Sequence, residues 1–590
     1  MTVRPGWLAW AVVGALLVTL LAQLPLAFAP FSDRHEAREA VVVADIVRHG
    51  HWIAPFPNED RIPTKGPLSY WWGAAVCSVL GLHPWSIRLA ILAWMTGTLA
   101  ATVALGSLID SRRTGWIAAG ILGTSLLYWR FMLYVRVDPA LVFCVTATLL
   151  AFTWALSRPR ARRLGNALAQ LALTGASLAK GLPALVPTLS VVGLVASLRR
   201  EGTLLASWGF VLALGAAVLV HPALALVAGA MAWLRLRQGP DRASPLFDLA
   251  PAVLLVGLVA LWLHLADARY PISYLEYVVV ESTSRIDAPG PPFWFYLPDF
   301  AKQFFPWSLL VPVALAAAVS RVRRRRDDPI AVPLAWLVVP FVLFSCFDQK
   351  RSPYVLPLFP AAALLVASVV AEPRSTTPAI RRWLARSEAA IAGVGGAVCL
   401  TMLADLAGRT LLGAGFLHVP DRTPLLAQIG AWQPGVELVL AACGAAWAAS
   451  LAVGGVRRWL VVFAGQAAVL ALAGVLLSAA PPEHPDAPDA FAARLAAILP
   501  ADAQLHYLDG ARDYGVVYYL DRRMKGLNLA QLTARATQPP PGAPPLYVLV
   551  EERADLPPAV AARAEELARG RGSDHWHRLL RFPAGAVGPR

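Results

Sequence analysis

Long apolar segments recur along most of the chain, and they predict membrane-spanning helices. A helix needs about 20 mostly apolar residues to cross a bilayer. The segment 7–29 is longer than the roughly 7–15 apolar residues of a signal-peptide core, so we expect an uncleaved span there. Several later segments are short and closely spaced, which predicts about 13–15 transmembrane helices. These segments lie near 84–108, 115–134, 139–156, 164–178, 182–198, 203–219, 222–234, 248–266, 303–320, 330–346, 353–371, 388–405, 434–453 and 459–478.

The pattern changes after residue 478. Residues 479–590 have the polarity of a soluble domain, with helical periodicity in some segments and alternation typical of strands in others. We therefore predict an all-α polytopic membrane domain over 1–478 and a small α/β domain over 479–590. The expected helices of the second domain are 490–499 and 559–569, and its expected strands are 504–508, 516–520, 546–550 and 577–582.

Composition supports a membrane protein and leaves one question about charge. The chain is 57% hydrophobic and 15% charged, whereas soluble domains carry about 25% charged residues, so a large soluble enzyme is excluded. The formal net charge is +15, which by itself could indicate a nucleic-acid partner. The arginines, however, gather in the short connections between apolar segments: 112–113, 158–163, 199–200, 235–242, 321–326, 374–386 and 457–458.

These arginine clusters predict the orientation of the chain. Short connections rich in arginine remain on the cytoplasmic side, so the positive charge indicates topology and no nucleic-acid partner is expected. We expect a multi-pass protein of the inner (plasma) membrane with a cytoplasmic N-terminus and an extracytoplasmic C-terminal domain. The longer connections 30–83 and 267–302 then lie on the outer face.

The outer connection 30–83 combines charged and apolar residues. Its charged part, 32–39, precedes an apolar stretch, and an aromatic cluster follows at 70–72. We expect two interfacial helices here, which would cover a cavity in the membrane. The alternative is a solvated loop with local ion pairs of little energetic weight.

Further ionisable residues gather at the outer ends of later segments. Four of the five lysines, Lys65, Lys180, Lys302 and Lys350, are expected on this outer face. Such groups are costly near a membrane and tend to mark function. Cations beside carboxylates would hold an anionic lipid headgroup. The sequence has no GxxxxGK[ST] or GxGxxG motif, so a soluble nucleotide donor is not expected.

Several short motifs follow one another in order over about 30–360. They are Glu36-Ala37-Arg38 with Gly50-His51-Trp52-Ile53-Ala54-Pro55, Thr64-Lys65-Gly66-Pro67-Leu68, Arg136-Val137-Asp138, Lys180-Gly181-Leu182-Pro183, 277–298, Pro306-Trp307-Ser308 and 348–357. In type and order these motifs resemble those of bacterial membrane glycosyltransferases of the aminoarabinose transferase-like family, which is related to protein O-mannosyltransferases and has the GT-C fold.

The resemblance implies an enzyme that moves a hexosyl or pentosyl group from a polyprenyl phosphate to an acceptor lipid, glycan or protein on the outer face. A carboxylate would accept the acceptor's proton, and cations would stabilise the departing phosphate. By position, the resemblance implies Glu36 as the base, with Asp138 as second choice. The substrate-binding residues that it implies are Arg38, Lys65, Arg136, Lys180, Glu281, Arg285, Tyr296, Lys350 and Tyr354.

The chain departs from the family's pattern at three positions. His35 replaces a common aspartate, Thr64 a glutamate and Ser282 a histidine. Glutamate and histidine are metal ligands, so we expect no bound metal at that place, and no cofactor. Transfer to the same acceptor as in the aminoarabinose enzymes is also not implied.

Three other functions are compatible with these residues. A transporter or flippase for a lipid-linked glycan is the main alternative, although the sequence lacks the repeat that such proteins often show. A non-catalytic subunit that keeps the fold and a protein O-mannosyltransferase are the others.

Overall fold

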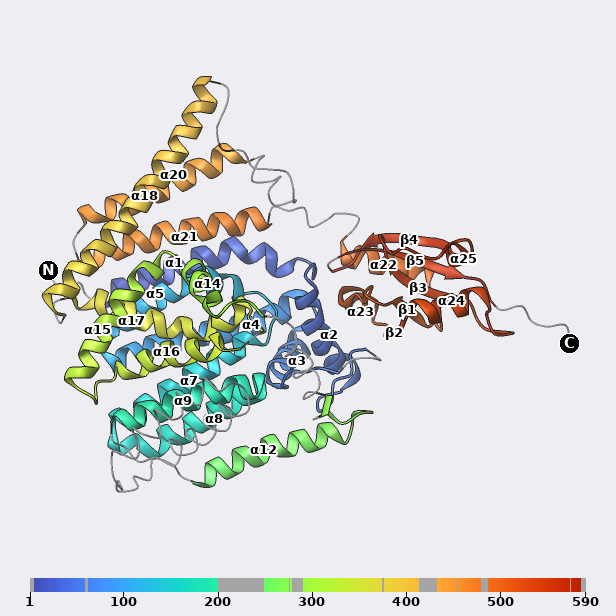
Figure 1. Cartoon of the computed structure of the whole chain (residues 1–590), viewed down its shortest axis with the longest axis horizontal. Coiled ribbons are helices and arrows are strands. Elements are labelled where there is room, and N and C mark those ends of the chain that lie inside the picture. Colours follow the sequence, from blue (N-terminus) through green and yellow to red (C-terminus); the bar gives the residue numbers. More distant parts are fainter. Residues whose placement is uncertain are drawn as a thin grey trace.

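The computed structural model describes residues 5–58, 62–199, 249–274, 276–277, 290–347, 349–373, 376–412, 417, 432–453, 455–478, 487–573 and 575–584. It consists of a large helical part and a small α/β domain at its C-terminal end (Figure 1). The helical part comprises α1 (Pro5–Phe28), α2 (Arg34–His49), α3 (Leu68–Leu80), α4 (Pro84–Ile109), α5 (Arg112–Gly123), α6 (Leu126–Phe131), α7 (Asp138–Ser157), α8 (Arg162–Lys180), α9 (Leu182–Leu198), α12 (Leu249–Asp267), α14 (Tyr296–Gln303), α15 (Val311–Arg324), α16 (Ala331–Ser345), η4 (Ser352–Leu358), α17 (Phe359–Ala371), α18 (Pro378–Leu412), α20 (Gln433–Ala449) and α21 (Val456–Ser478).

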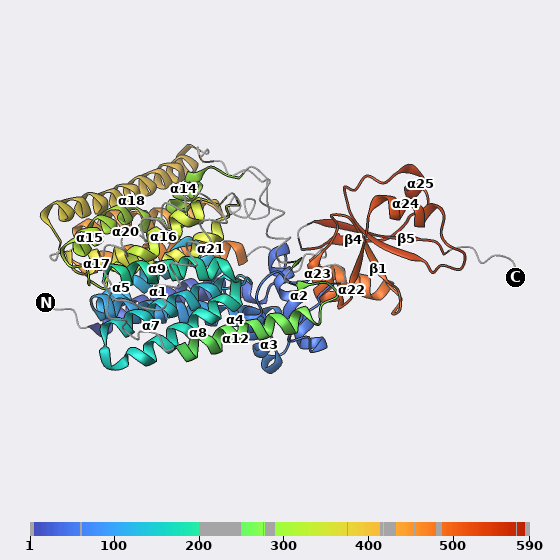
Figure 2. The ribbon, with the colours of Figure 1, turned by 60° about the horizontal axis from the view of Figure 1, so that its bottom comes forward.

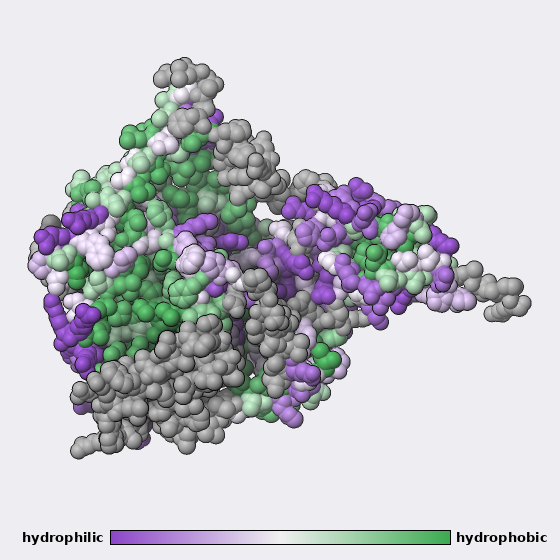
Figure 3. Space-filling view, viewed as in Figure 1, coloured by the Kyte–Doolittle hydropathy of each residue, from purple (hydrophilic) through white to green (hydrophobic). Residues whose placement is uncertain are grey.

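The helical part is built for a membrane. Within the described residues, seven helices are long and apolar enough to cross a bilayer, and a bent pair, Phe293–Gln303 with Trp307–Arg324, is an eighth candidate. Two of the expected spans, 203–219 and 222–234, lie outside the described residues, so the expected total of 13–15 stays a prediction. Figure 3 shows hydrophobic residues gathered over the helices and mostly hydrophilic residues over the C-terminal domain. The all-α polytopic architecture predicted from the sequence is confirmed.

Burial separates the inner helices from the peripheral ones. All residues of α17 are buried, as expected for a helix that is apolar on every side. On α1, by contrast, Trp10, Leu17 and Leu21 are exposed. Large apolar side chains on the surface of a bundle of this length fit contact with lipid.

The helix α2 lies between the bundle and the C-terminal domain (Figures 1 and 2). Asp33 begins it by accepting hydrogen bonds from the backbone N–H groups of His35 and Glu36, and Gly50 ends it with a positive φ of 71°. Most of the residues between Glu36 and Ile46 are buried. The expected first helix of the outer connection is therefore present, and it is covered by protein on several sides.

The C-terminal domain contains a five-stranded sheet of order β2-β1-β3-β5-β4. The pairs β1–β2 and β1–β3 are parallel, while β3–β5 and β4–β5 are antiparallel. In chain order the elements are α22 (Pro488–Ile498), β1 (Leu505–Leu508), α23 (Tyr514–Leu520), β2 (Met524–Leu527), α24 (Leu529–Thr537), β3 (Leu546–Glu551), α25 (Pro558–Ala561), β4 (Glu565–Arg571) and β5 (Trp576–Phe582).

Two elements predicted for this domain are wrong. The segment 516–520, expected to be a strand, lies in α23, because the buried carboxylate of Asp513 accepts a hydrogen bond from the N–H of Val516 and caps a helix there. The expected helix 559–569 ends at Ala561, and β4 follows as an edge strand paired with β5. A local side-chain cap in the first place, and pairing with a neighbouring strand in the second, outweighs the expected propensity.

The bundle and the C-terminal domain share one hydrophobic cluster. Phe31, at the start of the outer connection, is fully buried, and its ring packs edge-to-face against Tyr518 of α23 at 5.1 Å. Its N–H donates to the hydroxyl of Tyr519 at 3.0 Å. Ion pairs surround this cluster, between Arg48 and Asp521 and between Asp45 and Arg523.

Candidate active site

The carboxylate of Glu36 is fully used in structural contacts. It forms a buried ion pair with Arg88 of α4, with Nη2 to Oε2 at 2.9 Å, and accepts the backbone N–H of Val135 at 2.9 Å. Arg88 also donates to the carbonyls of Ala27 and Ala29. Glu36 therefore joins α2 to α4 and to the segment before α7.

One turn later on α2, Glu39 has a different set of partners. Arg38 donates to its Oε1 at 2.6 Å through Nη2, and the Tyr70 hydroxyl donates to its Oε2 at 2.5 Å. Burial works to raise the pKa of the Glu39 carboxyl, but the charges of Arg38 and Arg136 outweigh it and lower this pKa below its usual value. Glu39 is therefore an anion at neutral pH, and it holds Arg38 in place.

Asp138 and Lys180 form the centre of the site. Asp138 is 1% exposed at the first turn of α7, and Lys180 ends α8. Their charges match the helix dipoles at these two ends. Nζ of Lys180 lies 2.5 Å from Oδ1 of Asp138, and Nε of Arg136 lies 3.5 Å from Oδ2. In the described part of the chain, Oδ2 of Asp138 and Nε of Arg136 make no hydrogen bond.

Lys65 lies in the connection between α2 and α3, close to this pair. Burial, followed by the positive charge of Lys180, lowers the pKa of the Lys65 ammonium to about 8, although the charges of Glu39 and Asp138 oppose the shift. Gly66 makes this position possible, because a Cβ there would lie 2.0 Å from the carbonyl oxygen of Leu178 in α8. Close packing of the connection on α8 thus places Lys65 beside Lys180.

Together these residues form a cluster with excess positive charge, which we call the charged cluster. It contains four cations and two carboxylates, so two positive charges are unbalanced inside a partly buried site. An anion with several oxygens, such as a phosphate, complements this arrangement. The members of the charged cluster are Arg38, Glu39, Lys65, Tyr70, Arg136, Asp138 and Lys180.

Three other predicted residues lie on neighbouring segments. The Lys180 ammonium lies 4.7 Å from the ring centre of Tyr354 in η4, which places Tyr354 at the edge of the charged cluster. Tyr296 accepts the backbone N–H of Arg351, and Lys350 donates to the carbonyls of Pro291 and Phe347. Within the described residues these contacts support the loop before α14 and do not join Lys350 or Tyr296 to the charged cluster. Glu281 and Arg285 lie outside the described residues.

His35 lies near the charged cluster and is neutral at neutral pH. Burial, followed by the charges of Arg136 and Arg38, lowers its pKa below the usual 6.5. The expectation that no metal is bound near Thr64 stays a prediction, because Ser282 lies outside the described residues.

Three contributors to these contacts were not predicted from the sequence: Tyr70, Arg88 and the central place of Glu39. Arg88 was hidden inside an apolar segment, where a lone charge is costly and requires a partner. Glu36 and Glu39 stand three apart, a spacing that by itself places both on one helical face. The structure instead divides them between two cations on different elements.

Comparisons with known proteins agree with this fold. No protein-family model matches the chain. The chain is 28% identical over 380 residues to the undecaprenyl phosphate-alpha-4-amino-4-deoxy-L-arabinose arabinosyl transferase of Pectobacterium carotovorum subsp. carotovorum (strain PC1), covering 63% of this chain and 60% of that protein. It is 26% identical over 364 residues to transferase 2 of the same description from Proteus mirabilis (strain HI4320), covering 60% and 59%. The matches thus span about three fifths of these relatives.

Solved structures of ArnT from Cupriavidus metallidurans share the fold over the full length. The apo crystal structure has a TM-score of 0.71 and 18% identity, covering 99% of both chains. The crystal structure bound to undecaprenyl phosphate has a TM-score of 0.72 and 17% identity, covering 100% of both. The chain therefore has the GT-C fold of ArnT and is similar in sequence to the aminoarabinose transferases, which confirms the resemblance that its motifs indicated.

Proposed function

We propose that this chain is a membrane glycosyltransferase that takes a sugar from a polyprenyl phosphate. The charged cluster carries this proposal, since its unbalanced positive charge lies where α7 begins and α8 ends, close to α2. A lipid phosphate at that level would place its isoprenoid chain along the apolar helices. The similarity to transferases whose names specify an undecaprenyl phosphate-linked sugar supports the same donor class.

The reaction is a substitution at the anomeric carbon. The acceptor oxygen forms a bond to this carbon while the bond from the carbon to the phosphate oxygen breaks. The acceptor loses a proton, and the polyprenyl phosphate leaves as an anion. Lys65, Lys180 and Arg136 would stabilise the charge that develops on the phosphate, and Arg38 would orient it.

The two candidate bases differ in the partners of their carboxylate oxygens. Both oxygens of Glu36 are occupied by Arg88 and the N–H of Val135. Oδ2 of Asp138, in contrast, accepts no hydrogen bond from the described residues. We therefore favour Asp138 as the proton acceptor over Glu36, which was the first choice by motif position.

The sugar and the acceptor are assigned by chemical class alone. The donor sugar is a hexose or a pentose, and the acceptor is a lipid, a glycan or a protein. Membrane lipids surround the site, and no nucleic acid takes part. The departures at His35 and Thr64 lie beside the charged cluster, so the acceptor need not be that of the aminoarabinose enzymes.

We further propose that the charged cluster faces the outside of an inner (plasma) membrane. The N-terminal end of α1 and the C-terminal domain lie at opposite ends of the helical part (Figure 1). Arg321, from one arginine-rich connection, pairs at 2.9 Å with Asp110, which precedes Arg112 in another. Two arginine-rich connections therefore lie together at one end of the helical part. By the positive-inside rule, this supports a cytoplasmic N-terminus and an extracytoplasmic C-terminal domain.

Transfer in proteoliposomes tests the proposal. The full chain is reconstituted with radiolabelled undecaprenyl-phosphate sugars and a membrane extract that supplies acceptors. We expect labelled acceptor with wild type, a loss of at least about 100-fold with Asp138→Asn, and a loss with Lys65→Ala. Lys302→Ala, an exposed lysine of α14, is the matched control and should keep the wild-type rate.

The outcomes distinguish the alternatives. Loss of transfer in Glu36→Gln with wild-type folding, and full transfer in Asp138→Asn, would return the base to Glu36. Movement of labelled lipid across the bilayer without transfer to any acceptor would support a flippase and overturn the enzyme.

A further inference from the structure

A second group of side chains lies at the other end of α2, away from the charged cluster. Asp45 follows Arg38 by seven residues, which is about 10 Å along a helix. His49 ends α2, and Gly50, in the left-handed conformation at φ 71°, turns the chain so that His51 folds back toward the helix. Asp45 and His49 are four residues apart and therefore share one face of α2.

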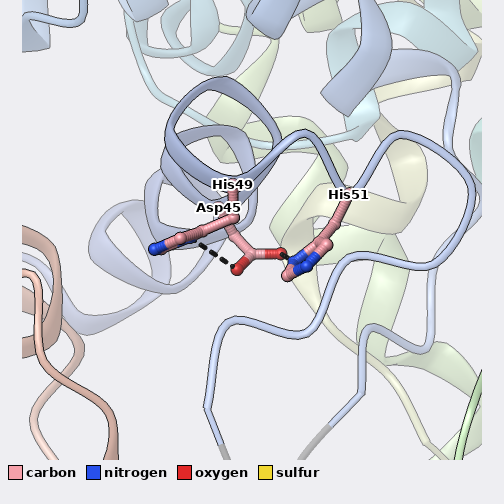
Figure 4. A group of neighbouring side chains, drawn as sticks. All are labelled: Asp45, His49 and His51. Carbon is pink, nitrogen blue, oxygen red and sulfur yellow. Dashed lines mark hydrogen bonds and ion pairs between the residues drawn. The ribbon is translucent and has the colours of Figure 1, made fainter.

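The three side chains converge on a small volume. Nδ1 of His49 lies 3.2 Å from Oδ1 of Asp45, and Nδ1 of His51 lies 2.9 Å from Oδ2. One ligand atom from each residue lies within 4.8 Å of the others. Figure 4 shows the carboxylate between the two rings, with each ring directed toward a different oxygen.

The carboxylate is held in place, and the rings remain accessible. The Asp45 side chain is 3% exposed, and its Oδ2 accepts the backbone N–H of Phe56 at 2.8 Å. Such a hydrogen bond to a ligand is a usual support of metal sites. The His49 and His51 side chains are 44% and 40% exposed, and an open cavity of about 380 Å³ adjoins Asp45 and His49. An ion from solvent can therefore reach the group.

We propose that Asp45, His49 and His51 bind a divalent transition-metal ion, with Zn²⁺ as the first candidate. Two neutral imidazoles and one carboxylate form a donor set that Zn²⁺ and its neighbours in the first row accept, with the remaining positions taken by water. The ion would replace the two His–Asp contacts with bonds to the same atoms. This site is separate from the charged cluster, and it does not depend on the proposed sugar transfer.

Arg523 would compete with the ion for the carboxylate of Asp45. Its Nη2 lies 3.3 Å from Oδ1 of Asp45, so its charge neutralises the carboxylate when no ion is bound. The Arg523 side chain is 36% exposed, and its guanidinium also lies over the Phe56 ring at 5.2 Å. It would therefore keep a contact with Phe56 after leaving Asp45. An ion would thus exchange one cation on Asp45 for another and fix the turn at Gly50, from which the connection to Lys65 starts.

Metal binding to the full chain in detergent tests this proposal. Zn²⁺ is titrated by calorimetry, and Cu²⁺ is used as a spectroscopic probe. We expect one tight Zn²⁺ per chain and nitrogen hyperfine coupling in the electron paramagnetic resonance spectrum of the copper form. The double variant His49→Ala/His51→Ala should bind at least about tenfold more weakly. His83→Ala, an exposed histidine at the start of α4, controls for adventitious binding and should leave the affinity unchanged.

The double variant should still fold, because it removes two rings that are largely exposed. Asp45→Asn, which keeps the shape of the side chain, should also weaken binding. Equal affinity and stoichiometry in wild type and the double variant would overturn the site, as would wild-type protein that binds no Zn²⁺.

Discussion

At the scale of residues, the carboxylates and cations of the site are distinguished by their partners. Glu36 joins Arg88 in a pair that supports three elements, Glu39 holds Arg38, and Asp138 meets Lys180 and Arg136. All are buried or partly buried, so they cannot be ranked by the small energies of surface ion pairs. Removing one partner leaves an uncompensated charge, and its effect shows whether the pair serves stability or chemistry.

The Arg88–Glu36 pair is expected to serve stability, and a substitution of Arg88 tests this. Arg88→Met leaves Glu36 as a buried, unpaired carboxylate and leaves the carbonyls of Ala27 and Ala29 without this donor, so we expect a loss of about 3–5 kcal/mol in stability. The double variant Arg88→Met/Glu36→Gln should recover part of this loss because it removes the buried charge as well. Thermal unfolding in detergent, followed by tryptophan fluorescence, measures both. An unchanged melting temperature in Arg88→Met would show that the pair is not structural.

Lys65 is expected to serve the chemistry, and the pH dependence of the reaction tests this. Its pKa is about 8, so the ammonium form exists below that value and is lost as the pH rises through it. If the charge of Lys65 binds the donor phosphate, kcat/KM for the donor should fall about tenfold between pH 7 and pH 9. Lys65→Arg should move this fall to higher pH because arginine stays protonated.

The control for this profile is Lys302→Arg, which replaces an exposed lysine and should reproduce the wild-type curve. A wild-type rate that stays constant from pH 7 to pH 9 would remove Lys65 from phosphate binding.

At the scale of elements, the site depends on how the connection before α3 packs on α8. No side chain separates Gly66 from Leu178, and Leu178 precedes Lys180 by two residues. The position of Lys65 relative to Lys180 is therefore set by backbone contact between two elements far apart in sequence. Such contact transmits a small shift directly into the charged cluster.

Gly66→Ala should disturb this geometry. The new Cβ would meet the Leu178 carbonyl oxygen at 2.0 Å, so the connection must move away from α8 and carry Lys65 with it. We expect a loss of transfer on the order of 100-fold and a loss of about 1–3 kcal/mol in stability. Gly393→Ala, in α18 with no neighbour within 4 Å, is the matched control and should keep the rate. Wild-type transfer by Gly66→Ala would mean that this packing does not position Lys65.

Some elements and contacts were predictable from the sequence, and others were not. The apolar segments and the soluble C-terminal region were readable because burial in lipid or protein leaves a periodic pattern. The charges of α2 and the motifs around Lys65, Asp138 and Lys180 were also readable, and the structure brings them together. The helix at 516–520 was not readable, because it starts at the carboxylate of Asp513, and this carboxylate is held by hydrogen bonds from Ser573, sixty residues later. The division of Glu36 from Glu39 was likewise hidden, since it depends on Arg88 and Tyr70 from other elements.

At the scale of the whole molecule, the C-terminal domain covers the outer connection. Its helix α23 packs on α2, and Tyr518 and Tyr519 contact Phe31. The same helix α2 carries Arg38 and Glu39 toward the charged cluster and ends at the proposed metal site. One element thus links the soluble domain to both sites, so the stability of this contact should decide how firmly the outer connection is held.

Tyr518 tests this link. Its ring is buried between Phe31, Tyr519 and the Arg48 guanidinium, so Tyr518→Ala should cost about 3–5 kcal/mol of packing between the domain and α2. Hydrogen exchange should then rise at least about tenfold in the buried part of α2, since its amides would open without global unfolding. Tyr518→Phe is the matched control: the hydroxyl has no hydrogen-bond partner among the described residues, so exchange should stay at the wild-type rate. Unchanged protection of α2 in Tyr518→Ala would mean that the membrane bundle alone orders this helix.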